Sequence, residues 1–188
     1  MTARLLKYAL IVVLVFGGFY LLMVSGMSSG SGEVEIGPHK VISHRSDRVV
    51  NSAEDTKNMV VQPSPEFLIE YAIGDGQHGF DILRIQADGS GEYTYWERES
   101  EPTRQKQLTF EVSVAELEEI CEQLNQSGFM ALASEYHGDL LDGTQIAITV
   151  VTGQVEKEVY CDNHFPVEVV AVADYLEKQV IQPHRNRS

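Results

Sequence analysis

The chain has 188 residues and a formal net charge of −14, with 28 acidic and 14 basic side chains. A field of this sign repels phosphate backbones and anionic lipid surfaces, so we expect no nucleic-acid partner. Once an apolar N-terminal segment is set aside, the remaining length accommodates one modest domain.

The N-terminus contains a long apolar run. Residues 8–24 are all apolar residues, glycine or tyrosine. A run of this length is at the lower limit for crossing the hydrocarbon core of a bilayer. Tyr8 and Tyr20 lie near its two ends, where amphipathic rings favour the membrane interface. We predict an uncleaved transmembrane anchor over 8–24, which makes the lipid bilayer a partner of this segment.

A cleaved signal peptide is the competing interpretation of the same run. The basic start is present, and Val24-Ser25-Gly26 forms a weak cleavage site. Against cleavage, the run exceeds the usual length of a signal peptide's apolar region, and the A-x-A pattern is absent. Cleavage would release a secreted domain, for which an inhibitor is the corresponding function.

The flanking charges predict the orientation. Arg4 and Lys7 precede the apolar run, and the first basic residue after it is Lys40. The positive-inside rule therefore places residues 1–7 in the cytoplasm and the rest of the chain outside. The predicted localisation is a single-pass membrane protein with an extracytoplasmic C-terminal domain.

Three segments follow the anchor. Residues 25–64 begin with a Ser/Gly-rich stretch and continue as a polar, charged sequence, which is typical of a flexible linker. Residues 65–182 carry the periodic patterns of a folded α+β domain. Residues 183–188 are expected to be a disordered tail.

The first half of the domain predicts a four-stranded meander. Apolar and polar residues alternate from Phe67 to Ile73, and Gly-rich turns separate the later strands. On the third strand Tyr93 and Tyr95 share a face opposite Trp96, so one of these two sets should be in the core. The predicted strands are 67–73, 80–86, 92–98 and 107–112.

A helix follows the meander. Ser113 and Glu116 have the spacing of a capping box, and Gly128 is suited to the left-handed residue that ends a helix. Between them, apolar residues recur at helical spacing and should face the sheet. These residues are Leu117, Ile120, Cys121 and Leu124.

The second half adds a β-hairpin, predicted at 145–151 and 155–161, and a closing helix from Pro166 to Pro183. Strands in groups, instead of strict βαβ alternation, indicate the α+β class. We therefore predict an antiparallel sheet, built as a four-strand meander, helix, β-hairpin and helix, packed against two helices and preceded by one transmembrane helix.

Cys121 and Cys161 are the two cysteines of the chain. Outside the cytoplasm such a pair can form a disulfide. Each cysteine also fits a buried apolar position, Cys121 on the helix stripe and Cys161 on the inward face of a strand, so free thiols in the core remain the alternative.

The acidic loop 136–143 is the best candidate for a site. His137, Asp139 and Asp142 are residue types that bind metal ions. The loop lacks EF-hand spacing, however, and Asp/Gly-rich loops are common because they turn easily. We expect no cofactor, and we find no catalytic constellation in the sequence.

The motifs together resemble a family of small bacterial domains of unknown function, which occur in exported or lipid-anchored proteins. The resemblance covers most of 65–180 and rests on Asp88-Gly-Ser-Gly-Glu-Tyr-Thr-Tyr, the capped helix at Ser113, and Gly128-Phe129. It rests further on Leu132, Tyr136, Asp142, the hairpin 146–161 and Pro166. It implies the fold but no activity. The family's cysteine pair after the first strand is absent, because this chain has Gly74-Asp-Gly-Gln-His-Gly there.

The sequence favours a non-enzymatic, membrane-anchored binding module with an extracytoplasmic protein partner. The anchor, the linker and the missing catalytic pattern support this interpretation. The alternative is an exported hydrolase or cation-dependent enzyme that uses the loop 136–143.

Overall fold

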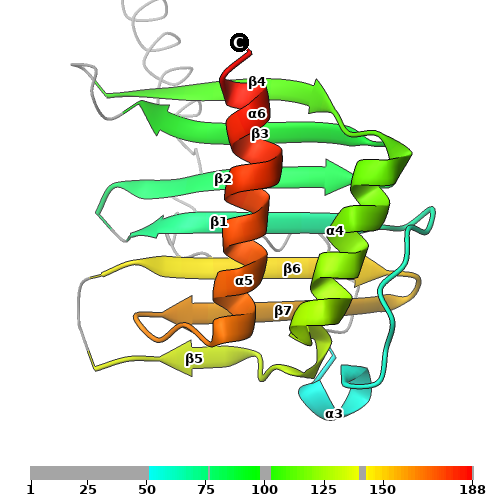
Figure 1. Cartoon of the computed structure of the whole chain (residues 1–188). Coiled ribbons are helices and arrows are strands. Elements are labelled where there is room, and N and C mark those ends of the chain that lie inside the picture. The colour runs from blue at the N-terminus through cyan, green and yellow to red at the C-terminus, as the bar shows by residue number, and fades with distance from the viewer. Residues whose placement is uncertain (1–50, 76, 98–102, 140–142, 188) are drawn as a thin grey trace, which may run out of the picture. The chain divides into compact units, whose positions relative to one another are not determined.

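The computed structural model describes residues 51–75, 77–97, 103–139 and 143–187. Its strands form one mixed sheet in the order β4-β3-β2-β1-β6-β7-β5 (Figure 1). The strands are β1 (Leu68–Asp75), β2 (Gly79–Gln86), β3 (Ser90–Glu97), β4 (Arg104–Glu111), β5 (Glu135–His137), β6 (Gln145–Thr152) and β7 (Val155–Asp162). The helices are α3 (Ala53–Thr56), α4 (Val114–Ser127), η1 (Phe129–Ala131), α5 (Val167–Tyr175), η2 (Leu176–Ile181) and α6 (Gln182–Arg185).

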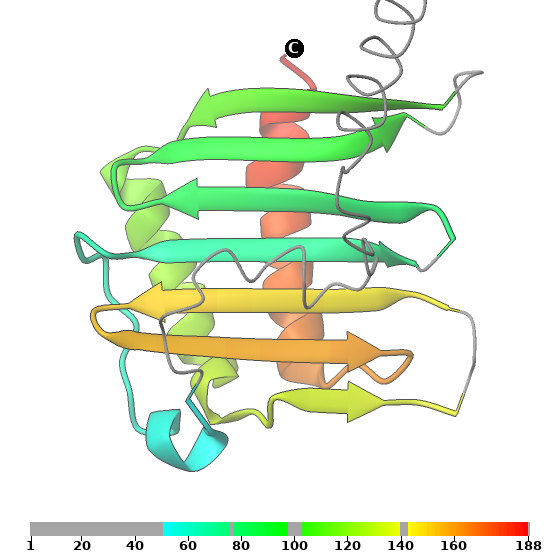
Figure 2. The same ribbon diagram turned by 180° about the vertical axis from the view of Figure 1, so that it is seen from behind.

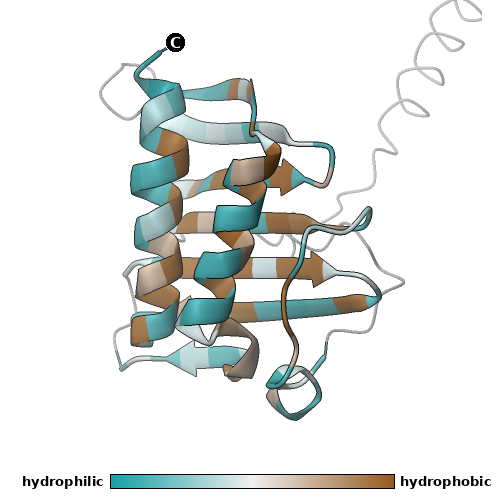
Figure 3. Ribbon diagram, turned by 45° about the vertical axis from the view of Figure 1, so that its right-hand side comes forward, coloured by the Kyte–Doolittle hydropathy of each residue, from teal (hydrophilic) through white to brown (hydrophobic). Residues whose placement is uncertain are grey.

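The long helices cover one face of the sheet. Helix α4 and the continuous run α5–η2–α6 lie side by side across the strands (Figure 1). Their apolar sides are directed toward the sheet and their polar sides away from it (Figure 3). Buried side chains of both layers, including Tyr71, Ile120 and Leu176, form the main core. The α+β fold class and the six predicted longer strands are confirmed; the predicted anchor over 8–24 lies outside the described residues.

Helix α4 begins and ends as its sequence predicts. Ser113 Oγ accepts a hydrogen bond from the Glu116 backbone amide, and the Glu116 carboxylate accepts one from the Ser113 amide at 2.7 Å. Gly128 has φ 75°, a left-handed conformation that a residue with a Cβ adopts only with strain.

The prediction of a purely antiparallel sheet is wrong at one edge. Strand β5 pairs in parallel with β7 over three residues, from Glu135 to His137. The Tyr160 amide donates to Ser134 O at 2.8 Å, and the Gly138 amide donates to Asp162 O at 2.7 Å. A segment this short shows no alternation in sequence, and its pairing depends on β7, so the sequence alone did not indicate it.

The folded part extends beyond 65–182 at both ends. Within the predicted linker, Thr56 and Val61 are buried, and Thr56 Oγ1 donates to Met130 O at 2.6 Å. Within the predicted tail, the helix continues past Pro183, and the His184 ring stacks on Phe110 with centroids 4.1 Å apart. Pro183 comes directly after the π-helical segment η2 in this continuous run, so the helix continues through a residue that has no backbone amide to donate.

Candidate functional site: the helix-free face of the sheet

No helix of the described part of the chain lies over the second face of the sheet, shown in Figure 2. We call it the helix-free face. Residues paired directly across antiparallel strands share a face, so the strand registers define its composition. One row crosses six strands and contains Glu158, Thr149, Glu70, Arg84, Glu92 and Thr109. The next row contains Tyr160, Ala147, Ala72, Ile82, Thr94 and Gln107.

The first row, which we call the charged row, has one ion pair at its centre. Arg84 Nε donates to Glu70 Oε1 at 2.9 Å between the neighbouring strands β2 and β1. The Glu70 side chain is 4 % exposed and that of Arg84 is 33 % exposed. A buried carboxylate is costly without a cation, so Arg84 offsets much of the desolvation of Glu70.

Four residues of the second row, which we call the apolar row, belong to a small apolar cluster separate from the main core. Ala72, Ala147, Tyr160 and Phe80 are buried together, and Ile82 packs against them. The two alanines occupy the centre, on β1 and β6, while the larger side chains come from β2 and β7 on either side. The helix-free face therefore presents an acidic strip directly beside an apolar one.

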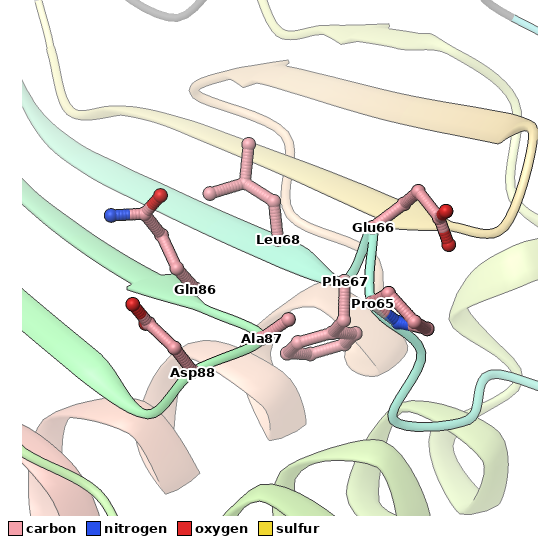
Figure 4. A pocket seen from close by; sticks show the side chains of 7 residues that line it. All are labelled: Pro65, Glu66, Phe67, Leu68, Gln86, Ala87 and Asp88. Atoms are coloured by element: carbon pink, nitrogen blue, oxygen red, sulfur yellow. The ribbon is translucent and has the colours of Figure 1, made fainter.

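Two pockets adjoin the charged row at the end of the sheet near Gln86. One is lined by residues 65–68 and 86–88, and Figure 4 shows Leu68 and Gln86 directed to one side of the sheet and Phe67 to the other. The second pocket is lined by Arg84, Gln86 and parts of β3 and β4. Gln86 lines both pockets, and its Nε2 donates to Ser90 Oγ at 3.1 Å.

The turn between β2 and β3 holds this end of the face in register. Gly89 has φ 84°, and a Cβ there would come within 2.4 Å of Val112 O, so only glycine fits. Asp88 Oδ1 accepts hydrogen bonds from the Ser90 amide at 2.9 Å and from Ser90 Oγ at 2.6 Å. These hydrogen bonds hold the pKa of the Asp88 carboxyl below its usual value.

The structure does not bring together the candidate metal ligands that it describes. His137 is exposed, with Nε2 3.3 Å from Glu135 Oε2 and its ring edge-on to Tyr160. Asp139 is exposed, and Asp142 lies outside the described residues. Among the described residues, no group of three or more acidic, histidine or cysteine side chains is placed to hold a metal ion.

Cys121 and Cys161 are free thiols in the structure, and both are buried. Cys121 lies on α4 and Cys161 on the helix-covered face of β7, in the same core cluster. Burial raises the pKa of each thiol to about 11. A protonated thiol in an apolar core is a poor nucleophile, so neither cysteine has the surroundings of a catalytic residue.

The aromatic side chains of β3 lie on alternate faces of the sheet, as the two-residue period of a strand predicts. Tyr93 is buried in the main core, and Tyr95 stacks on it with ring centroids 5.2 Å apart. The Arg185 guanidinium lies over the Tyr95 ring, 4.7 Å from its centroid. Trp96 is on the helix-free face, where its indole packs against Gly79.

A polar contact inside the helix–sheet interface has no counterpart in the sequence predictions. Tyr71 Oη donates to Glu177 Oε1 at 3.2 Å, and Glu177 belongs to the π-helical segment η2. Burial raises the pKa of the Glu177 carboxyl, and burial together with the charge of Glu177 raises that of the Tyr71 hydroxyl. A π-helix shifts the phase of side chains along the helix, which periodicity of 3.6 does not anticipate.

The charged and apolar rows were also missed by the sequence interpretation. Glu70 interrupts the otherwise apolar run 67–73, and Glu156 and Glu158 alternate with other residues along β7. Those residues were a signal for a second, polar face, but only the strand order and register show that they lie side by side.

Two further findings concern helices that could cross a membrane and similarity to known proteins. In the described part of the chain, no helix combines the length and the apolar character needed to cross a bilayer. A search against models of known protein families finds no match, and neither does a search of curated proteins.

Proposed function

We propose that this protein is a non-enzymatic binding module, anchored in a membrane, whose helix-free face binds an extracytoplasmic protein partner. The observation that carries the proposal is the pairing of the charged row with the apolar row on one face. Protein interfaces commonly combine an apolar centre with hydrogen-bonding and charged groups around it.

The dimensions of the face suit a protein ligand. Strands lie about 4.8 Å apart and rise about 3.3 Å per residue, so the six eight-residue strands span roughly 24 Å by 26 Å. This is comparable to the roughly 800 Å² that one partner contributes to a standard interface. A small molecule would cover only a fraction of it.

The charge of the face favours a basic partner. Among the described strand residues, seven carboxylates lie on it, against one guanidinium, that of Arg84. The carboxylates are those of Glu70, Glu92, Glu111, Glu135, Glu156, Glu158 and Asp162. Opposite charge on a partner would accelerate its association and fix its orientation.

The sequence supports the membrane location. The apolar run 8–24, with basic residues only on its N-terminal side, would hold the domain on the far side of the bilayer. A reporter fused after Ser188 is expected to be active outside the cytoplasm. Activity only in the cytosol would contradict the proposed topology.

Charge reversal on the two sides of the domain tests the binding surface. Glu92→Lys on the helix-free face should reduce the partner recovered with the full chain after cross-linking in cells by roughly tenfold or more, a difference of about 1.4 kcal/mol. Glu118→Lys, on the exposed side of α4, makes the same charge change and should leave recovery unchanged. Equal recovery with both variants, or loss only with Glu118→Lys, would contradict the proposal.

A further inference from the structure

The chain enters the described domain at the outer edge of β7. The Asn51 amide donates to Glu156 O at 3.0 Å, and Asn51 Nδ2 donates to the same oxygen at 3.4 Å. Residues that follow Asn51 lie on the helix-covered side, where Val61 exchanges hydrogen bonds with Asn125 of α4. Asn51 is therefore held at the β7 edge, beside the helix-free face.

On strand β6 the helix-free face is nearly inaccessible to solvent, although Gln107 and Thr109 on β4 are exposed. Thr149 is 3 % exposed and Val151 is 0 % exposed, although no described helix lies over them. Thr149 Oγ1 has no hydrogen-bond partner among the described residues. A buried hydroxyl without a partner is costly, so its surroundings favour a ligand with polar groups at this point.

The sequence just before Asn51 is chemically complementary to this face. Residues 39–50 contain Lys40, Arg45 and Arg48 against one acidic residue, Asp47, in a chain whose net charge is −14. The same residues include β-branched side chains suited to an extended conformation against an apolar strip. These side chains are Val41, Ile42, Val49 and Val50.

The distances permit the segment to reach the Arg84–Glu70 pair. Twelve extended residues span about 40 Å. From β7 to β2 there are three strand spacings, or about 14 Å. The segment can therefore cross the charged and apolar rows without disturbing the hydrogen bonds of Asn51.

We propose that residues 39–50 of this chain bind the helix-free face of the sheet, with their basic side chains against the charged row. This inference shares only the binding surface with the proposed function, and it names an occupant within the same molecule. An external partner would then compete with this segment, since both would use the same carboxylates.

Paramagnetic broadening in the full chain tests the proposal. A nitroxide on Ser46→Cys, in protein held in lipid nanodiscs, should broaden the methyl signals of Ala72 and Ala147. It should leave Ala115, exposed on α4, unaffected. Cys121 and Cys161 are buried with raised pKa values, so the label should react with the introduced cysteine.

A charge variant and a mixing experiment complete the test. Arg45→Glu should abolish the broadening of Ala72 and Ala147, whereas Lys57→Glu, the same charge change after the segment, should preserve it. Absence of broadening in the labelled chain, or equal broadening of Ala115, would overturn the proposal. Broadening in a mixture of isotope-labelled chain with unlabelled nitroxide chain would also overturn it, because the occupant would be a second copy. Recovery of an external partner is a separate measurement, so either proposal can fail alone.

Discussion

Arg84 lies directly opposite Glu70 on neighbouring strands, and its guanidinium Nε donates to the Glu70 carboxylate at 2.9 Å. The pair stands at the centre of the charged row, between Thr149 on β6 and Glu92 on β3. The pair therefore stabilises the central strands and also lies on the surface that we propose as the binding site.

Replacement of Arg84 should destabilise the domain. Arg84→Met removes the cation beside a carboxylate that is 4 % exposed, and we expect a loss of about 1–3 kcal/mol in the free energy of unfolding. Urea unfolding followed by the fluorescence of Trp96, the single tryptophan, measures it. Lys106→Met removes the cation of the more exposed Lys106–Glu97 pair and should have a much smaller effect. Equal losses in the two variants would contradict this account of the pair.

The capping box of α4 should contribute measurably to stability. Ser113→Ala removes the hydroxyl that accepts from the Glu116 amide, and we expect a loss of about 1 kcal/mol. Ser113→Asp restores an acceptor and should recover most of that loss in the same urea experiment. If Ser113→Ala unfolds at the same urea concentration as the unchanged protein, the cap contributes nothing.

Glu177 should make stability depend on pH. Burial raises the pKa of Glu177 in the folded state above the ordinary 4.5. The contribution of its protonated carboxyl to the free energy of unfolding is therefore fully present below pH 4.5, and it is lost as the pH rises through the pKa of the folded state. Glu177→Gln keeps an acceptor for Tyr71 Oη and removes the titration. Relative to the unchanged protein, the variant should therefore gain stability as the pH rises from 4 toward 7.

Urea unfolding at a series of pH values measures this difference. Glu118→Gln, at an exposed position of α4, serves as the control and should follow the unchanged protein. A Glu177→Gln variant that loses stability relative to the unchanged protein over this range would show that the folded state favours the ionised carboxylate.

The two cysteines should react only on unfolding. Burial and a pKa of about 11 keep Cys121 and Cys161 protonated and shielded at pH 8. A colourimetric thiol reagent should find no reactive thiol in the native protein and two in urea without reductant. No reactive thiol in urea would demonstrate a disulfide, the alternative that the sequence left open.

Much of the fold follows from local patterns in the sequence. The cap at Ser113, the left-handed Gly128 and the alternation from Phe67 to Ile73 each act within a few residues, so their consequences are visible in the sequence. Strand β5 and the burial of Thr56 depend on partners more than 20 residues away, Tyr160 and Met130, and no local pattern encodes them.

The candidate site was hardest to predict for the same reason. Glu70, Arg84 and Glu158 come from three strands, and their proximity depends on the strand order β2-β1-β6-β7. The loop of His137 and Asp139 is a candidate metal site in the sequence because residue types that bind metal ions lie close together there. Among the described residues, however, no group of three or more such side chains is placed to hold a metal ion.

Site-specific photocross-linking tests the binding surface most directly. A photoreactive residue at Gln107, exposed on the helix-free face, and one at Glu118, exposed on α4, are compared in the full chain in its native membrane. The account predicts a discrete adduct with another protein from Gln107 and none from Glu118. An adduct from Glu118 alone would place the binding surface on the helices and contradict the central claim.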